Sequence, residues 1–132
     1  MIEIATFFIL AATIYQEGRG ESVEGQKAIA KVILNRAYKE PAPPGEAIPA
    51  VIYRKLQFSC WNNGNRPSKI QFWDTQAMLK AMAVAADALE EWSNGDRLSG
   101  ADHYYNPTLA NPSWAKSMKV IAVIGNHRFL KS

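Results

Sequence analysis

The chain has 132 residues, of which 48% are hydrophobic, and it carries a formal net charge of +3. This length and composition favour one domain over residues 1–132 with a substantial core. The sequence contains no run of eighteen or more apolar residues, so we expect no stable membrane insertion. The single cysteine, Cys60, excludes an intramolecular disulfide. The charge is spread without a basic block or a recognition helix, so nucleic acid is not the expected partner.

The first predicted element is a core helix over residues 2–16. Five apolar residues recur there at helical spacing. They are Ile4, Phe7, Phe8, Ala11 and Ile14. The glycines of Glu17-Gly18-Arg19-Gly20-Glu21 end the helix, because glycine disfavours helix and turns readily. The segment has no basic start and no small-residue cleavage site, so we interpret it as a core helix and see no export signal.

A second helix is predicted over residues 23–38, with Ser22 as its N-cap. One face is apolar, with Ile29, Val32, Ile33 and Ala37. A polar stripe on the other face, expected to be solvated, consists of Lys27, Lys31, Asn35 and Lys39. Prolines in the following segment end this helix.

The rest of the chain predicts a short helix over residues 48–53, a turn-rich stretch over 62–67 and a long helix over 75–92 capped by Asp74. The residues expected to face inward on the long helix are Met78, Leu79, Met82, Ala85, Ala86 and Leu89. An extended segment follows over 101–107, then a helix over 113–124 and a terminal strand over 126–130. The predicted fold class is mainly α (α+β), with a few short strands beside a cleft.

Glu17 is the first candidate for chemistry, because it lies where an apolar helix breaks. Burial against Phe7, Phe8 and Tyr15 would raise the pKa of its carboxyl group, and a protonated carboxyl group is what glycosidic bond cleavage requires. The alternative is structural: two glutamates around glycines also occur as solvated or capping residues.

Aromatic and amide side chains gather in three places, at residues 57–61, 103–106 and 112–114. Sugars bind by stacking on aromatic faces, with hydrogen bonds from amides and hydroxyls. The alternative is that Trp61, Trp92 and Trp114 fill the core, which we favour for Trp92. Cys60, His103 and His127 lack chelating spacing, so no metal or cofactor is expected, and nothing favours a thiol nucleophile.

Several motifs together resemble the SleB-like cell wall hydrolase family. They are Ile14-Tyr15-Gln16-Glu17-Gly18-Arg19-Gly20-Glu21, Glu24-Gly25-Gln26, Val32-Ile33-Leu34-Asn35-Arg36, Gln57-Phe58-Ser59, Tyr104-Tyr105-Asn106-Pro107 and Ile124-Gly125-Asn126-His127-Arg128-Phe129. The resemblance covers nearly the whole chain in order. One departure is Gly18, where the family has alanine. The resemblance implies a lysozyme-like or lytic-transglycosylase-like fold.

The resemblance also implies roles for individual residues. Glu17 would be the catalytic acid. Glu21 would have a supporting role in the turn or cleft. From the aromatic and amide clusters we also expect supporting roles for Ser59 and Tyr104, and substrate-binding roles for Gln57, Phe58, Trp61, His103, Tyr105 and Asn106.

The implied activity is cleavage of the β-1,4 bond between N-acetylmuramic acid and N-acetylglucosamine in peptidoglycan. A lytic transglycosylase needs one carboxylate, whereas a hydrolytic muramidase needs a second, for which Asp74 and Asp102 are candidates. A glycan-binding module without catalysis is a further alternative. Without an export signal or binding repeats, the expected protein is a monomeric bacteriophage or prophage endolysin, made in the cytoplasm and acting at the cell wall.

Overall fold

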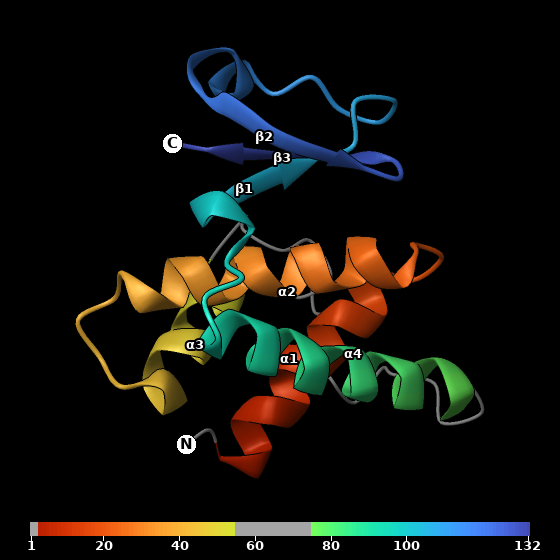
Figure 1. Cartoon of the computed structure of the whole chain (residues 1–132), viewed down its shortest axis with the longest axis vertical. Coiled ribbons are helices and arrows are strands. Elements are labelled where there is room, and N and C mark those ends of the chain that lie inside the picture. Colours follow the sequence, from red (N-terminus) through yellow and green to blue (C-terminus); the bar gives the residue numbers. More distant parts are fainter. Residues whose placement is uncertain (1–2, 55–74) are drawn as a thin grey trace.

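The computed structural model describes residues 3–54 and 75–132. Over these residues the chain forms a group of helices beneath a small antiparallel sheet (Figure 1). The elements are α1 (Ile4–Glu17), α2 (Val23–Tyr38), α3 (Pro44–Tyr53), α4 (Thr75–Ser93), the 3-10 turn η3 (Leu98–Gly100), β1 (His103–Tyr105), the 3-10 turn η4 (Ser113–Ser117), β2 (Lys119–Ile124) and β3 (His127–Lys131). The predicted mainly helical fold with a few short strands is confirmed.

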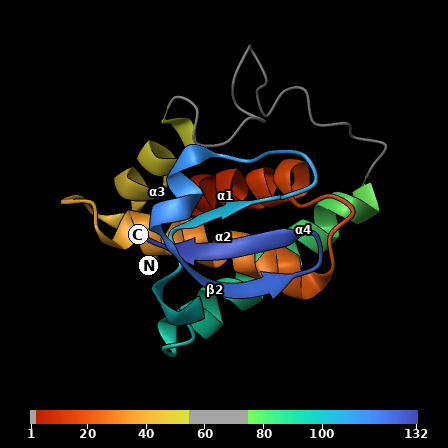
Figure 2. The ribbon, with the colours of Figure 1, turned by 90° about the horizontal axis from the view of Figure 1, so that it is seen from above.

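Helix α2 is the central element, because α1, α3 and α4 all pack on it and β1 lies over it (Figures 1 and 2). Its predicted apolar face is buried, and the Ser22 hydroxyl caps its first turn by accepting from the Gly25 N–H at 3.1 Å. The predicted solvated stripe is wrong at Lys31 and Asn35, which are 5% and 6% exposed.

These two polar residues are buried because α4 and η3 supply partners for them. Lys31 Nζ lies 2.8 Å from Glu91 Oε1 and 3.0 Å from Asp96 Oδ2. Asn35 Nδ2 donates to the carbonyl oxygens of Arg97 and Ala101, and Asn35 Oδ1 accepts from the indole N–H of Trp92. Trp92 itself packs against the core, as favoured from the sequence.

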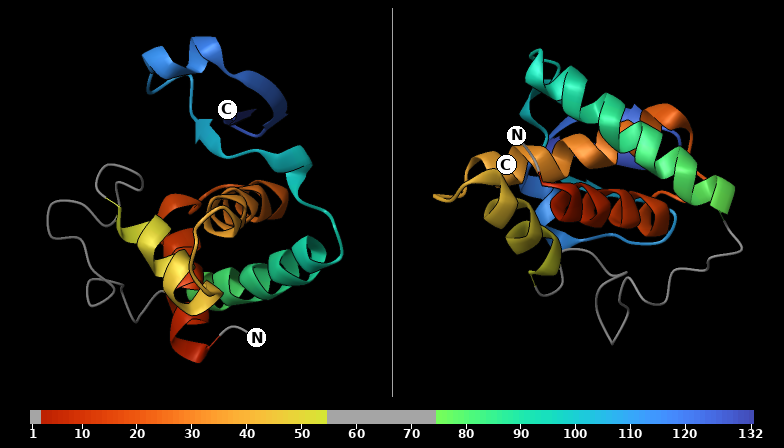
Figure 3. Two further views of the ribbon diagram at one scale, coloured as in Figure 1. Left: turned by 90° about the vertical axis from the view of Figure 1, so that its left-hand side faces the viewer. Right: turned by 90° about the horizontal axis from the view of Figure 1, so that it is seen from below.

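The apolar stripes of α1 and α4 differ in part from the prediction. Ile4 and Phe8 are 87% and 42% exposed, because the first turns of α1 project past α4 (Figures 1 and 3). On α4 the predicted inward residues Leu79 and Ala86 are exposed. The buried side chains of α4 are small ones, Ala81, Val84, Ala85 and Ala88. Small residues let α4 lie close against both α1 and α2.

The sheet has the order β1-β3-β2, with both pairs antiparallel. The predicted extended segment and terminal strand are confirmed as β1 and β3. The predicted helix over 113–124 is wrong, because only η4 is helical and β2 follows it. The β2 sequence is rich in β-branched residues and leads into Gly125-Asn126, so strand pairing with β3 prevails over a helical period that a short apolar run cannot establish. Helix α3 also begins earlier than predicted, at Pro44, where a proline in the first turn is tolerated.

Candidate active site

Glu17 is the last residue of α1, and its position is fixed by a close crossing of α1 and α2. The Gly18 N–H donates to the Ile14 carbonyl at 2.8 Å, and Gln26 Nε2 of α2 donates to the Gly18 carbonyl at 3.0 Å. A Cβ atom at Gly18 would lie 3.0 Å from Ile14 O and 3.1 Å from Gln26 Cγ. Gly18 therefore serves close packing, whereas Gly20, with φ of +87°, makes the turn itself.

The sheet reaches Glu17 through Tyr104 of β1. The Tyr104 hydroxyl lies 3.2 Å from Glu17 Oε1. The Tyr104 ring packs on His127 and Phe129 of β3, with centroids 5.3 and 5.7 Å away. Phe129 is fully buried, so the Tyr104 ring is held by the core. The structure thus brings together the expected catalytic residue and one of its expected supporting residues, which are 87 positions apart in the chain.

The surroundings expected for Glu17 from α1 itself are only partly found. Phe8 is 42% exposed. Tyr15 is buried, and its hydroxyl accepts a hydrogen bond from Arg19 Nη1 at 2.8 Å. The sheet adds Tyr104, which the sequence does not place beside Glu17.

Glu21 joins the α1–α2 turn to the β2–β3 turn. Its side chain is 11% exposed. Its Oε1 lies 3.1 Å from His127 Nδ1, and its Oε2 accepts from Asn126 Nδ2 at 3.3 Å. A Cβ atom at Gly125 would lie 3.0 Å from Glu21 Oε1. The closing motif of the sequence contained these partners, but spacing alone did not pair them with Glu21.

His103 and Tyr105 lie on the other face of β1 from Tyr104, as the two-residue period of a strand requires. Both contact Trp114 of η4, with ring centroids 5.0 and 5.8 Å away. Asn106 Oδ1 accepts from the Thr108 N–H and hydroxyl, which makes a local turn. The structure does not bring these three predicted substrate-binding residues into contact with Glu17.

Five residues weighed for binding or catalysis, and one weighed as a helix cap or second carboxylate, lie outside the described part of the chain. They are Gln57, Phe58, Ser59, Cys60, Trp61 and Asp74.

Asp102, the other candidate for a second carboxylate, is buried and anchors the C-terminus to α2 and β1. Its carboxylate accepts from Lys39 Nζ at 2.8 Å and from the Ser132 hydroxyl and N–H at 2.6 and 2.9 Å, and it lies 2.9 Å from His103 Nδ1. Burial raises its pKa, but the hydrogen bonds from Lys39, Ser132 and His103 outweigh this and hold the pKa well below its ordinary value. Every polar site of this carboxylate is therefore committed to the fold.

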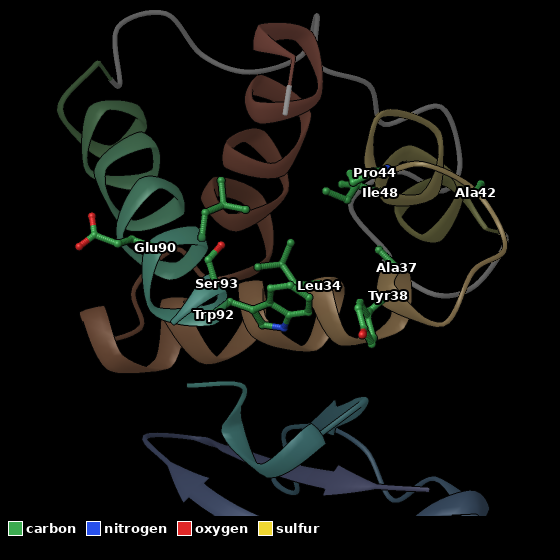
Figure 4. A pocket seen from close by; sticks show the side chains of 10 residues that line it. Leu34, Ala37, Tyr38, Ala42, Pro44, Ile48, Glu90, Trp92 and Ser93 are labelled. Carbon is green, nitrogen blue, oxygen red and sulfur yellow. The ribbon is translucent and has the colours of Figure 1, made fainter. Parts of the chain in front are cut away.

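One cavity lies away from Glu17, between α2, α3 and α4 (Figure 4). Its volume is about 660 Å³ and its lining is mainly apolar. A second cavity, of about 360 Å³, lies between the C-terminal ends of α2 and α3 and the start of β1. Over residues 3–54 and 75–132 there is no group of three His, Cys, Asp or Glu side chains able to hold a metal ion. No helix in the same ranges is long and apolar enough to span a membrane.

A half-buried glutamate at a helix end, in contact with a small sheet, is a site suited to proton transfer. The chain belongs to the cell wall hydrolase family, whose profile matches residues 20–130. The match begins after Glu17 and includes Glu21. The family predicted from the motifs is therefore confirmed.

Individual relatives cover more of the chain. It is 33% identical over 123 residues to the spore cortex-lytic enzyme of Oceanobacillus iheyensis, covering 93% of this chain and 40% of that protein. The chain thus spans less than half the length of the curated relatives it matches.

Two solved structures are similar to this fold. The catalytic domain of the germination-specific lytic transglycosylase SleB from Bacillus anthracis superposes with a TM-score of 0.76 at 29% identity, covering 98% of this chain and 96% of that one. The catalytic domain of the Bacillus cereus SleB protein gives 0.72 at 29% identity, covering 99% and 93%. These similarities support the predicted class of enzyme, one that cleaves glycosidic bonds.

Proposed function

We propose that this domain cleaves the β-1,4 bond between N-acetylmuramic acid and N-acetylglucosamine in peptidoglycan, as a lytic transglycosylase in which Glu17 is the only catalytic carboxylate. Membership of the cell wall hydrolase family supports the substrate class. The similarity to a structure described as a lytic transglycosylase supports the reaction type.

The observation that carries this proposal is that Glu21 and Asp102 both have hydrogen-bond partners within the fold. Glu21 is engaged by His127 and Asn126, and Asp102 is engaged by Lys39, Ser132 and His103. A hydrolytic muramidase needs a second carboxylate free to act as nucleophile or to activate water. Glu21, in the α1–α2 turn, and Asp102, next to β1, are instead both hydrogen-bonded to residues of the fold, so we assign neither of them this role.

In the proposed reaction Glu17 transfers a proton twice. Its carboxyl group first protonates the glycosidic oxygen, and the bond to the anomeric carbon of the muramic residue breaks. The resulting carboxylate then accepts the proton of the muramic 6-hydroxyl as that oxygen bonds to the same anomeric carbon. The products are a 1,6-anhydromuramic end and a free sugar hydroxyl, and Glu17 regains its proton.

The contact with Tyr104 suits both protonation states of Glu17. A phenol hydroxyl donates to a carboxylate and accepts from a carboxylic acid. The Tyr104 hydroxyl lies within hydrogen-bond distance of Glu17 Oε1. Tyr104 would thereby orient the carboxyl group through the whole cycle.

We further propose a sugar-binding surface, an oligomeric state and a biological setting for this domain. Trp114, with His103 and Tyr105 beside it, offers an aromatic surface on which a sugar would stack. We also propose a monomer that acts at the cell wall in bacterial lysis, with an endolysin of phage type as the biological setting.

The test is mass spectrometry of the soluble fragments released from purified peptidoglycan by the wild type and by Glu17→Gln. We expect fragments with 1,6-anhydromuramic ends from the wild type and a loss of about a hundredfold or more in Glu17→Gln, with an unchanged fold. Fragments with reducing muramic ends, one water heavier, would identify a hydrolase. Binding to peptidoglycan without release of fragments would identify a glycan-binding module.

A further inference from the structure

A second polar site lies beside the one that contains Glu17. The cavity of about 360 Å³ is lined by three cationic side chains, two carboxylates and one histidine. They are Arg36, Lys39, Arg54, Glu40, Asp102 and His103. The cations outnumber the carboxylates, so the cavity attracts anions.

The two carboxylates of this cavity are already paired within the protein. Asp102 is bound by Lys39, Ser132 and His103. Glu40 Oε1 accepts from Arg54 Nη2, whose side chain is 48% exposed. Arg54 can therefore turn toward a ligand, while the buried Asp102 keeps its partners.

Arg36 connects the cavity to the neighbourhood of Glu17. Its Nε donates to the Asp102 carbonyl. The pKa of Arg36 is lowered, chiefly by burial and also by the nearby charge of Arg54. The nearby Tyr104 and Asp102 act in the opposite direction. Arg36 thus lies close to the tyrosine that contacts Glu17, and an added anion would stabilise the partly buried guanidinium.

The distance between Glu17 and the cavity is comparable to the length of a peptidoglycan stem peptide. Gln26, which contacts Gly18, precedes Arg36 by ten positions on α2, which corresponds to about 15 Å of helix. The glycan strand of peptidoglycan is uncharged, but each muramic residue can carry a stem peptide with free carboxylates. Four extended residues span about 13 Å, which is about 2 Å less than this stretch of helix, and the long side chain of Arg36 or Arg54 covers the remaining distance between the stem and the cavity.

We propose that the cavity between Arg36, Arg54 and His103 binds a carboxylate of the stem peptide, so that the enzyme prefers glycan strands that carry stems. This inference rests on the proposed function. It adds a specificity-determining site to it, with Arg54 and Arg36 as the residues that recognise the carboxylate. Arginine is suited to this because its planar fork binds a carboxylate through two hydrogen bonds.

The test compares two substrates, namely intact peptidoglycan freed of teichoic acid and the same strands stripped of stems by an amidase. The measured quantity is the ratio of kcat/KM for stem-bearing over stem-free strands. We expect a ratio above one for the wild type, about tenfold lower for Arg54→Gln. Lys119→Gln removes one exposed charge from β2, away from the cavity, and should keep the ratio of the wild type.

A variant expected to raise this ratio distinguishes recognition of the stem carboxylate from a general disturbance of the structure. Glu40→Gln removes the carboxylate that competes for Arg54, so it should raise the ratio above that of the wild type. A structural disturbance would lower activity on both substrates in both variants. Equal ratios in the wild type, Arg54→Gln and Glu40→Gln would overturn the inference while leaving the proposed function intact, whereas no cleavage of either substrate would reject the proposed function itself.

The source of the anion is tested with a third substrate, peptidoglycan that retains its teichoic acid phosphates. If the Arg54→Gln effect appears only on this substrate, the cavity recognises a phosphate and the assignment to stem carboxylates is wrong.

Discussion

The two ends of β3 are held by two carboxylates of different character, one partly buried and one buried. At its start, Glu21 contacts His127 and Asn126 and ties the sheet to the α1–α2 turn. Just beyond its end, Ser132 donates twice to Asp102, which Lys39 of the α2 C-cap also contacts. Between these two ends, Phe129 of β3 pairs with Tyr104 of β1, and Tyr104 connects the sheet to Glu17.

The two anchoring carboxylates differ in the number of partners that the fold gives them. Asp102 accepts from charged and neutral donors on all sides, so it stays ionised and contributes to stability. Glu21 has fewer partners, and they lie in the hairpin turn next to the chemical site. We therefore expect loss of Asp102 to affect mainly folding. A change near Glu21 should affect folding and activity together, and a change at Tyr104 should affect mainly activity.

The largest effect on stability is expected for Asp102→Ala. This change leaves Lys39, His103 and Ser132 without their shared acceptor, and breaking such a buried group costs about 3 kcal/mol. Unfolding by denaturant should show this loss, while the exposed Asp87→Ala on α4 should stay within about 0.5 kcal/mol of the wild type. Equal stabilities of the two variants would remove the distinction between the anchors.

The same carboxylate predicts a pH dependence. Its folded pKa is lowered, so its contribution to stability is complete above its unfolded pKa of about 3.9 and is lost as the pH falls toward the folded pKa. The free energy of unfolding of the wild type should therefore fall below about pH 5, and that of Asp102→Asn should fall less steeply. Parallel curves would show that Asp102 does not carry the acid sensitivity.

An intermediate effect is expected for Gly125→Ala in the β2–β3 turn. Gly125 has φ of +58°, and an added Cβ would lie 3.0 Å from Glu21 Oε1. Gly95 has φ of +99° and open space, so Gly95→Ala measures the backbone cost alone. We expect Gly125→Ala to cost about 2 kcal/mol, roughly 1 kcal/mol more than Gly95→Ala, and to lower activity as well.

Equal costs for the two glycine variants, with full activity in Gly125→Ala, would mean that the turn tolerates a shifted Glu21. Glu21 and Asp102 would then differ only in the number of their hydrogen bonds, and Glu21 would have no effect on activity.

The sequence predicts the helical framework of the site well, because its signals are local. The Ser22 cap, the glycines after Glu17 and the apolar face of α2 each act within a few residues. The burial of Lys31 was missed, because its acidic partner Glu91 lies 60 positions away. A polar residue at helical spacing predicts a solvated face unless such a distant partner is known.

The same limit applies to the sheet and to the site. The strand β2 was predicted as a helix, since its preference is decided by pairing with β3 rather than by its own short apolar run. The contact of Tyr104 with Glu17 and that of His127 with Glu21 depend on this sheet. The motifs indicated that these residues belong together, but only the packing of β1 and β3 over α2 shows which residue contacts which.

The smallest change is the removal of one oxygen atom in Tyr104→Phe, and it addresses the chemistry most directly. The ring keeps its packing on His127 and Phe129, so the free energy of unfolding should change by less than about 1 kcal/mol. The carboxyl group of Glu17 loses a partner that orients it, so kcat should fall about tenfold with little change in KM. Tyr38→Phe is the matched control, because Tyr38 is 69% exposed on α2 and its ring contacts Trp92 and Arg97, outside the proposed site. If the two variants have the same kcat, Tyr104 packs beside Glu17 without orienting it, and the proton transfer depends on Glu17 and its surroundings in α1 and α2.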